Sequence, residues 1–484
     1  MRKNFFKIGI IYSIGQIFSK AAAFLLIPIY TKSLGIEMYG QLALVDTLFD
    51  FILGFVIISI YSGYTRYYQE YDLKNKKVLK NTAINFAIIM AIFDISIVLM
   101  LGDKISSIIL QIPNARYILI LIVFRALLNQ IIALLLREYD LKYEPRVTVI
   151  TNLLNMILSM ILAILFVVKF KRGVSGIYEA YVIVYAISAI ILFLVNIPNY
   201  RLELNKVMLR QMLQFSSGML PSCMASTVLN MSDRYFLKDY RSFEATGIYS
   251  IGYKFGMLID PIFVGPFNQL FTPLKFDSWK KKNAHEIFNY MFDKYNLIGG
   301  FFIISISVFT KFILILFGMN EYLVAFKIVP FIILSYFIYG KAAFYSLGIQ
   351  VKNKTYLDGF VMMIGGILNI ILNMILIPKM GMYGAAIATI ISYSIMNILY
   401  TNIGKKLYHI KYSLKTSIKV YSIVIIIFSI YYFLSLNNEN LLFEFVIATI
   451  MVLLYILLSL LIKLVTIEEL KMYIIAIIKK IKKN

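Results

Sequence analysis

Residues 173–180 read GVSGIYEA and residues 381–388 read GMYGAAIA, so both glycines and the final alanine recur at an offset of 208. At an offset of 207, EMYG at 37–40 corresponds to EATG at 244–247. The first pair opens the sixth and twelfth apolar segments of the chain, and the second pair opens the second and eighth. Because six is an even number, halves repeated in this way have the same orientation in a membrane. The repeat therefore predicts two six-helix lobes, although short glycine-containing turns also recur by chance.

The chain contains fourteen apolar segments, each with about the 17–25 residues that cross a bilayer as a helix. Its mean hydropathy of +0.80 excludes a soluble multidomain protein. The first segment resembles a signal peptide, but Lys20 interrupts the apolar run, which resumes through Ile29, and we expect an uncleaved helix. The fold class predicted is an all-α polytopic membrane protein with fourteen transmembrane helices. The predicted segments are 8–29, 41–63, 81–102, 116–137, 147–168, 174–198, 213–232, 247–273, 295–318, 322–349, 356–377, 381–403, 416–436 and 441–462.

The positive charge of the chain falls mainly on one side of these segments. With the N-terminus inside, and with Arg116 and Arg137 counted with the loops that they adjoin, 31 of the 48 Lys and Arg lie on inner segments, 10 lie on outer loops and seven lie within apolar segments. This asymmetry predicts that both termini are cytoplasmic. The net charge of +23 is explained by topology and by anionic lipid, so we expect no nucleic-acid partner.

These patterns divide the chain into three parts. Residues 1–198 form a predicted N-terminal six-helix lobe, and residues 199–404 form a predicted C-terminal six-helix lobe. Residues 405–484 hold two accessory helices, the thirteenth and fourteenth, and a tail in which isoleucines recur at helical spacing among lysines. Such a basic amphipathic tail is typical of a helix that lies on anionic lipid.

The residues needed for most catalytic sites are missing from the chain. No G-x-x-x-x-G-K-[ST] sequence occurs, which excludes a P-loop for ATP. The two histidines, His285 and His409, fall in predicted cytoplasmic loops, which excludes a histidine-based metal site or proton relay in the membrane. The single cysteine, Cys223, allows no intrachain disulfide. We therefore expect no enzyme, no metal and no cofactor.

What remains is a set of ionisable side chains inside apolar segments, where charge is costly and usually functional. The alternative for any one of them is a structural ion pair, or a side chain that reaches the interface, as we expect for Lys311, Lys327 and Lys419. Segment eight is broken by prolines and glycines, which is tolerated where the helix lines a cavity. We predict that four cations bind an anionic substrate: Lys20, Arg125, Lys254 and Lys341. We predict that four acids bind a coupling cation: Asp46, Asp50, Asp94 and Asp260.

The sequence resembles a known family at its start and at its repeats. IPIYTKSLG at 27–35, leading into EMYG at 37–40, is similar to the first helix and loop of Wzx-type polysaccharide flippases. These flippases belong to the multidrug/oligosaccharidyl-lipid/polysaccharide (MOP) exporter superfamily. The G-x-x-G sequences that open segments six and twelve resemble the same family. The resemblance covers essentially the whole chain, and its motifs mark the family and not the cargo.

The resemblance implies a function in polysaccharide biosynthesis. It implies that undecaprenyl-pyrophosphate-linked oligosaccharide, a repeat unit of O-antigen or capsule, is flipped from the cytoplasmic to the outer leaflet by alternating access. It also implies coupling to H⁺ or Na⁺, a place in the bacterial cytoplasmic membrane, and other polysaccharide assembly proteins as partners. Two alternatives stay open: a multidrug/cation antiporter of the same superfamily, and a membrane glycan polymerase or ligase. The four predicted cations inside apolar segments disfavour an antiporter, because cationic drugs would bind in an acidic cavity. The short outer loops disfavour the polymerase or ligase.

Overall fold

The structure, a computed structural model, describes residues 2–58, 60–142, 144–218 and 220–466. Within these ranges it describes side chains from Phe24 onward, except at positions 55–58, 145, 199, 220–222, 224, 230 and 231. All regular structure in these ranges is helical, which confirms the predicted all-α fold class. The chain forms two compact units, Met1–Gly247 (unit 1) and Ile248–Asn484 (unit 2), and each is described by itself.

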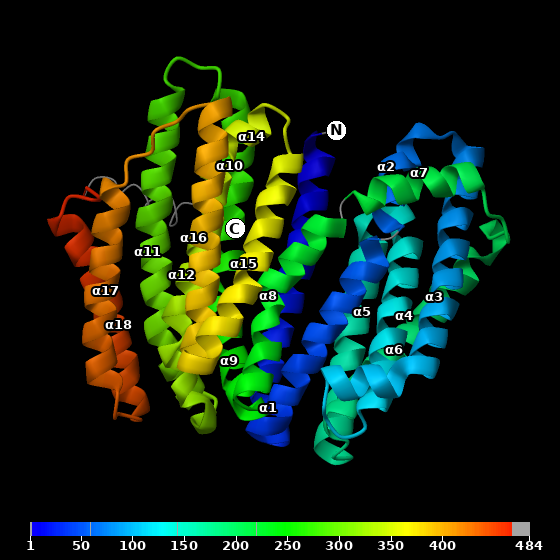
Figure 1. Ribbon diagram of the computed structural model, residues 1–484, viewed down its shortest axis with the longest axis horizontal. Helices are drawn as coiled ribbons and strands as arrows, with labels where there is room; N and C mark the ends of the chain where they lie inside the picture. Colours follow the sequence, from blue (N-terminus) through cyan, green and yellow to red (C-terminus); the bar gives the residue numbers. More distant parts are fainter. Residues whose placement is uncertain (1, 59, 143, 219, 467–484) are drawn as a thin grey trace. The chain divides into compact units, whose positions relative to one another are not determined.

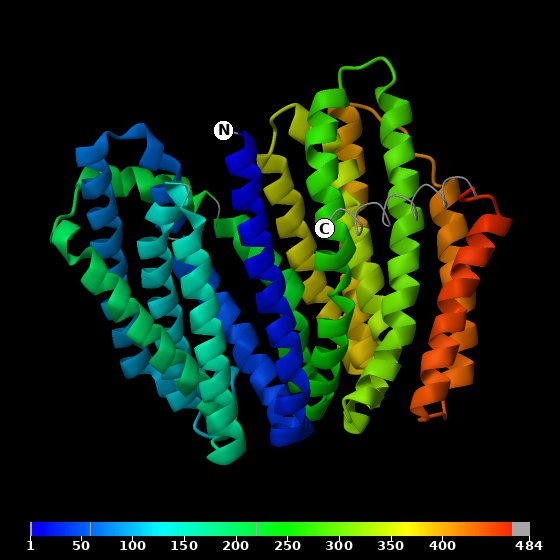
Figure 2. The ribbon, with the colours of Figure 1, turned by 180° about the vertical axis from the view of Figure 1, so that it is seen from behind.

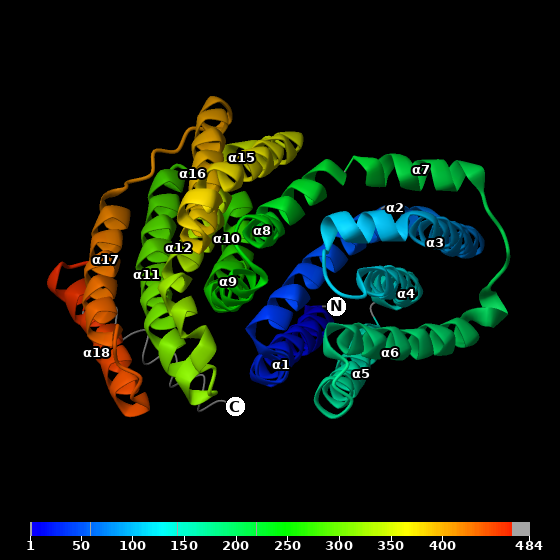
Figure 3. The same ribbon diagram turned by 60° about the horizontal axis from the view of Figure 1, so that its bottom comes forward.

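Unit 1 is built from long helices joined by short turns (Figure 1). Its first helix bends sharply at Gly35, where φ is 73°, so it contains two of the predicted segments in succession. Helix α4 is central: it packs against α1, α3, α5 and α6, as Figures 1 and 3 show. The elements are α1 (Arg2–Ile58), α2 (Tyr61–Tyr67), η1 (Tyr68–Glu70), α3 (Leu73–Ile109), α4 (Ala115–Leu141), α5 (Pro145–Ile164), η2 (Leu165–Lys169), α6 (Gly173–Asn196), η3 (Ile197–Asn199), α7 (Lys206–Ser217) and α8 (Leu220–Tyr240).

Unit 2 has the same kind of architecture, with two helices added at its edge. Helices α17 and α18 pack against α11, and the views from either side agree (Figures 1 and 2). The elements, the first of which begins in unit 1, are α9 (Phe243–Gly256), η4 (Asp260–Val264), α10 (Gly265–Ser278), α11 (Ala284–Leu316), η5 (Asn320–Lys327), α12 (Val329–Gly340), α13 (Ala342–Tyr345), α14 (Leu347–Val351), α15 (Tyr356–Met380), α16 (Met382–Leu407), α17 (Lys415–Ser435) and α18 (Leu441–Leu461).

Ten of the described helices are long and apolar enough to cross a membrane. The other predicted segments fall on α1, on α8 and on the broken run from α9 to α10, so the structure is consistent with fourteen spans. Helix starts are marked by capping side chains, because a helix leaves its first N–H groups without partners. Asp72 accepts from the backbone N–H of Asn75 at the start of α3, and Asn440 accepts from that of Phe443 at the start of α18.

Two boundaries differ from the sequence prediction. The segment predicted over 213–232 is divided, because α7 ends at Ser217 and α8 begins at Leu220. The longest outer loop, predicted over 233–246, is mostly helical, since α8 continues to Tyr240 and α9 begins at Phe243. Polar residues at the end of α8, including the buried Asp233, give this stretch the composition of a loop. The tail predicted to lie on lipid, beyond residue 466, is outside the described residues.

The repeated glycines have matching roles in the backbone. Gly173 and Gly381, which correspond at the 208 offset, have φ of 59° and 56° and lie at the starts of α6 and α16. Only glycine adopts this left-handed region without strain. Gly40 and Gly247, which correspond at the 207 offset, contact each other: a Cβ on Gly247 would lie 3.2 Å from the backbone nitrogen of Gly40. These observations support the repeat, while the lobe boundaries at 198 and 404 stay predictions.

Candidate functional site

In unit 1, two of the predicted site residues, Arg125 on α4 and Asp46 on α1, belong to one cluster. The guanidinium carbon lies 3.8 Å from the ring centroid of Phe49 on α1 and 3.7 Å from that of Tyr181 on α6. The ring of Tyr178, one turn before Tyr181, is 5.1 Å away. Three aromatic rings therefore lie close to the guanidinium, an arrangement that stabilises a cation through the ring quadrupoles. We call these residues, with Asp46, the Arg125 cluster.

Asp46 enters this cluster through Tyr178. The Tyr178 hydroxyl donates a hydrogen bond of 2.8 Å to Oδ1 of Asp46, while the same ring lies beside Arg125. Asp46 and Arg125 do not pair directly within the described part of the chain. The Nε of Arg125 is buried and has no hydrogen-bond partner among the described residues. The cluster thus contains one cation, Arg125, and one acid, Asp46, which the hydroxyl of Tyr178 connects. The Nε–H of Arg125 is a hydrogen-bond donor that no described residue uses.

Of the other predicted residues of unit 1, Asp50 lies near Tyr178 of this cluster, Asp94 lies away from it, and the side chain of Lys20 cannot be placed. Asp50 is one turn after Asp46 on α1 and is partly buried. Asp94 on α3 forms no hydrogen bond or ion pair with other described residues, and its neighbours Ile92 and Phe93 are exposed. Lys20 lies on α1, but its side chain is outside the described residues.

In unit 2 the predicted break in segment eight is confirmed. Helix α9 ends at Gly256, a π-helical turn spans Asp260–Val264, and α10 begins at Gly265. Pro261 and Pro266 cannot donate backbone hydrogen bonds, which explains the interruption. Lys254 lies just before the break and Asp260 lies within it, and both side chains are partly buried.

Lys341 lies at a second interruption, between α12 and α13, with only 4% of its surface exposed. Its Nζ donates to the hydroxyl of Tyr421 on α17 at 2.7 Å. It also lies 4.9 Å from the ring centroid of Phe337 and 5.3 Å from that of Phe292. No acid of the described residues forms an ion pair with Lys341. Like Arg125, it is a cation held by aromatic groups and not by a carboxylate.

Lys341 also lines a groove of about 790 Å³ in unit 2. The walls of the groove are α12, α16, α17 and the connection that carries Ile410 and Tyr412. Its lining includes Lys405 and Lys411 and contains no aspartate or glutamate. Helices α16 and α17 make few contacts with each other, and this leaves the space between them.

Lys311 corrects one expectation from the sequence. Instead of extending to the interface, it is buried on α11 and pairs with Glu444 on α18, with Nζ 3.1 Å from Oε1. Glu444 also accepts hydrogen bonds from Tyr431 at 3.0 Å and Ser435 at 2.7 Å. Both ions are almost fully buried, so the pair needs these extra hydrogen bonds. It ties the α17–α18 pair to α11 and is a structural ion pair.

A buried polar group between α15 and α16 was missed by sequence reasoning, which considered only ionisable side chains. The amide of Asn373 donates to Asn369 at 3.1 Å, and that of Asn369 donates to Thr389 at 3.4 Å. Asn369 and Asn373 are fully buried, and Thr389 is 2% exposed. The signal in the sequence was the four-residue spacing of two asparagines in an otherwise apolar helix.

Comparisons with known proteins agree on a class of membrane proteins. A family model described as "Polysaccharide biosynthesis protein" matches residues 5–274. The chain is 31% identical over 85 residues to "Lsg locus putative protein 1" of Haemophilus influenzae, a match that spans 18% of this chain and 21% of that protein. Most of the length of that relative is thus unmatched.

Two solved structures share the fold. "Lipid II flippase MurJ, inward closed conformation" has a TM-score of 0.70 at 17% identity, with 92% of this chain and 98% of that chain covered. An inward-facing multidrug resistance MATE family transporter of the MOP superfamily has a TM-score of 0.63 at 14% identity, covering 80% and 94%. At these identities the likeness establishes the fold.

Proposed function

Because this chain belongs to the polysaccharide biosynthesis protein family and spans the membrane with a flippase-type fold, we propose that it flips a lipid-linked oligosaccharide. The substrate class proposed is undecaprenyl-pyrophosphate-linked repeat units of surface polysaccharide. They are moved from the cytoplasmic to the outer leaflet of the bacterial cytoplasmic membrane by alternating access. The match to a family model over 5–274 supports the pathway, and the lipid II flippase MurJ is an example of a lipid flippase with this fold.

The observation that carries the proposal is that Arg125 and Lys341, inside membrane-spanning segments, form no ion pair with a carboxylate of the described residues. A cation in the membrane interior is costly unless an anion accompanies it. A pyrophosphate group supplies that anion during transport. Arg125 offers a planar fork that suits phosphate oxygens, while Lys20, Lys254 and Lys341 act as point charges.

The acids are proposed to serve the coupling ion. Asp46, Asp50, Asp94 and Asp260 bind H⁺ or Na⁺, and Asp46 is placed for this because Tyr178 connects it to Arg125. Loading the cation on Asp46 neutralises the acid beside Arg125, which strengthens the positive field there and favours binding of the anionic substrate, and loss of the cation favours its release. Asn variants at these positions are expected to alter the ion dependence of transport.

Alanine variants test the role of the cations. Arg125→Ala and Lys254→Ala should each abolish surface polysaccharide without loss of the protein from the membrane, and Lys254→Arg should be milder because only charge is required there. Lys354→Ala, at an exposed lysine, serves as the matched control. Normal surface polysaccharide in both Arg125→Ala and Lys254→Ala would refute the assignment.

A multidrug antiporter is the second candidate, favoured by the MATE-like fold. Cationic drugs require an acidic cavity, whereas Lys341 and the groove that it lines contain no acid, and the Arg125 cluster pairs its one acid with a cation. Expression in a drug-sensitive host distinguishes the two: drug resistance supports the antiporter, and restored polysaccharide in a flippase-deficient host supports the proposal.

A further inference from the structure

The groove between α12, α16 and α17 has the chemistry of an anion site with an apolar extension. Its volume of about 790 Å³ falls within the range typical of ligand pockets, about 300–1,000 Å³. Three lysines line it, Lys341, Lys405 and Lys411, and no acid does. Lys405 and Lys411 are exposed and form no ion pair with any acid in the described part of the chain. The positive charge of the groove is therefore uncompensated.

Two buried polar atoms in the lining lack partners. The side-chain oxygens of Asn397 and Ser417 are buried without a hydrogen-bond partner among the described residues. Asn397 is 7% exposed and Ser417 is 3% exposed, and they lie on opposite walls, α16 and α17. Buried polar atoms are nearly always hydrogen-bonded, so a ligand with polar groups is expected between them.

The wider part of the groove is apolar and open. Ile398 on α16 and Ile418 and Ile425 on α17 line it and are 56%, 63% and 65% exposed. On a membrane-spanning unit, isoleucines this exposed face the hydrocarbon core. The groove thus offers hydrocarbon contact along its walls and positive charge at one end.

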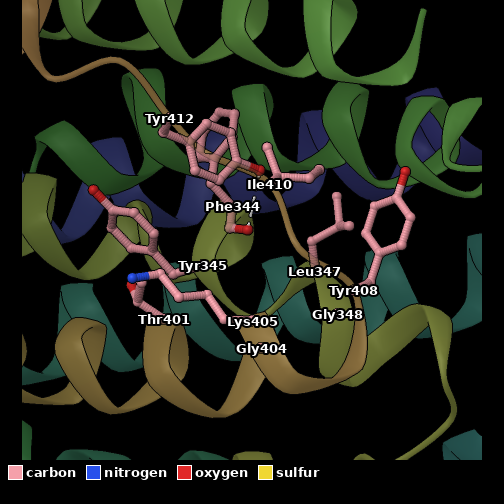
Figure 4. A pocket seen from close by; sticks show the side chains of 10 residues that line it. All are labelled: Phe344, Tyr345, Leu347, Gly348, Thr401, Gly404, Lys405, Tyr408, Ile410 and Tyr412. Atoms are coloured by element: carbon pink, nitrogen blue, oxygen red, sulfur yellow. Dashed lines mark hydrogen bonds between the residues drawn. The ribbon is translucent and has the colours of Figure 1, made fainter. Parts of the chain in front are cut away.

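The charged end is built on a rigid crossing of helices. Figure 4 shows Lys405 lying along α16 beside Tyr345 and Thr401, with Tyr412 across from them. Gly348 and Gly404 let α14 and α16 approach closely, since a Cβ on Gly348 would lie 2.5 Å from the Gly404 carbonyl. Tyr412 donates to the carbonyl of Phe344 at 3.2 Å, and burial raises the pKa of its phenol, which stays neutral and does not repel an anion.

We propose that this groove binds an anionic glycerophospholipid of the surrounding bilayer, with its phosphate between Lys405 and Lys411 and one acyl chain along Ile398, Ile418 and Ile425. Bulk phospholipid is favoured over the polyprenyl carrier because the exposed isoleucines keep the groove in contact with the bilayer at all times. Lys341, which the proposed function assigns to the substrate, lies at the floor of the groove. The test therefore uses only Lys405 and Lys411.

The experiment titrates the delipidated full chain in detergent with dioleoyl phosphatidylglycerol and with dioleoyl phosphatidylcholine, and follows lipid retention by native mass spectrometry. Phosphatidylglycerol should bind more tightly. The double variant Lys405→Gln/Lys411→Gln should weaken its binding about thirtyfold, because each lysine beside an anionic headgroup contributes about fivefold. The matched control removes the same charge from neighbouring exposed lysines outside the groove, Lys406→Gln/Lys415→Gln, and should bind phosphatidylglycerol as the wild type does.

Three outcomes would overturn the proposal. One is equal loss of binding in the groove variant and in its control. The second is displacement of phosphatidylglycerol by an equal amount of undecaprenyl phosphate, which would assign the groove to the carrier lipid. The third is displacement by inorganic phosphate, which would make the groove a soluble-anion site. Surface polysaccharide is measured in parallel in the Lys405→Gln/Lys411→Gln variant. This measurement distinguishes a change in phosphatidylglycerol binding from failure of the proposed flippase function.

Discussion

The cations inside the helices of this protein are stabilised in two ways. Lys311 is neutralised by Glu444 at 3.1 Å, as a structural ion pair. Arg125 and Lys341 are instead held by aromatic rings and a phenol, with no carboxylate partner among the described residues. The sequence placed all three in apolar segments, but it predicted a substrate role only for Arg125 and Lys341 and expected Lys311 to reach the interface. Their different partners could not be predicted, because Phe49, Arg125 and Tyr181 are far apart in sequence and meet only after three helices pack.

Replacement of Arg125 by lysine tests whether planarity matters in the Arg125 cluster. Lysine keeps the charge but cannot fill the space between the rings of Phe49 and Tyr181, nor can it bind two phosphate oxygens at once. We expect Arg125→Lys to lower polysaccharide export about tenfold, the effect of about 1.4 kcal/mol. Export should be measured at matched protein levels in the membrane. Wild-type export in Arg125→Lys would show that charge alone suffices.

Removal of Glu444 tests the structural ion pair. Glu444→Gln leaves Lys311 buried and only partly compensated, and breaking a buried pair costs about 3–5 kcal/mol. We expect a clear fall in the melting temperature of the purified protein. The double variant Lys311→Met/Glu444→Gln should recover part of it, because no uncompensated ion remains. A single variant as stable as the wild type would contradict the pairing.

At the scale of elements, apolar length set the positions of most helices. The segment predicted over 116–137 is α4 at Ala115–Leu141, and the one predicted over 174–198 is α6 at Gly173–Asn196. The interruption at Lys341 was not predicted from apolar length: α12 ends at Gly340, and Lys341 then donates its side-chain hydrogen bond to Tyr421 on another helix. Apolar length thus predicted where helices are, and prolines and glycines predicted the break in segment eight but not the one at Lys341.

The contact between the corresponding glycines 40 and 247 gives a test at this scale. A Cβ on Gly40 would lie 1.9 Å from the carbonyl oxygen of Phe243, a distance that cannot be relieved without moving backbone. Gly40→Ala should therefore lower the melting temperature. Gly54→Ala, in the same helix, should leave it unchanged, because the nearest atom lies at 3.8 Å. Equal stability of the two variants would show that the helices at Gly40 separate easily.

At the scale of the whole molecule, the distribution of Lys and Arg predicts the orientation of the chain in the membrane. The 31 inner and 10 outer Lys and Arg predict fourteen spans with cytoplasmic termini. Reporter fusions after Asn199 and Asn437 should report cytoplasmic and external locations respectively. The same location at both positions would contradict this topology. The candidate cations and acids came from the same analysis of charges inside apolar segments, and their roles in binding stay proposals.

The central claim is that this protein carries a lipid-linked oligosaccharide across the membrane. The most direct measurement is the leaflet distribution of the lipid-linked repeat unit in cells with and without the protein. We predict that loss of the protein makes the repeat unit accumulate on the cytoplasmic leaflet, and that the wild-type chain, but not Arg125→Ala, restores it to the outer leaflet. An unchanged distribution in cells without the protein would contradict the account.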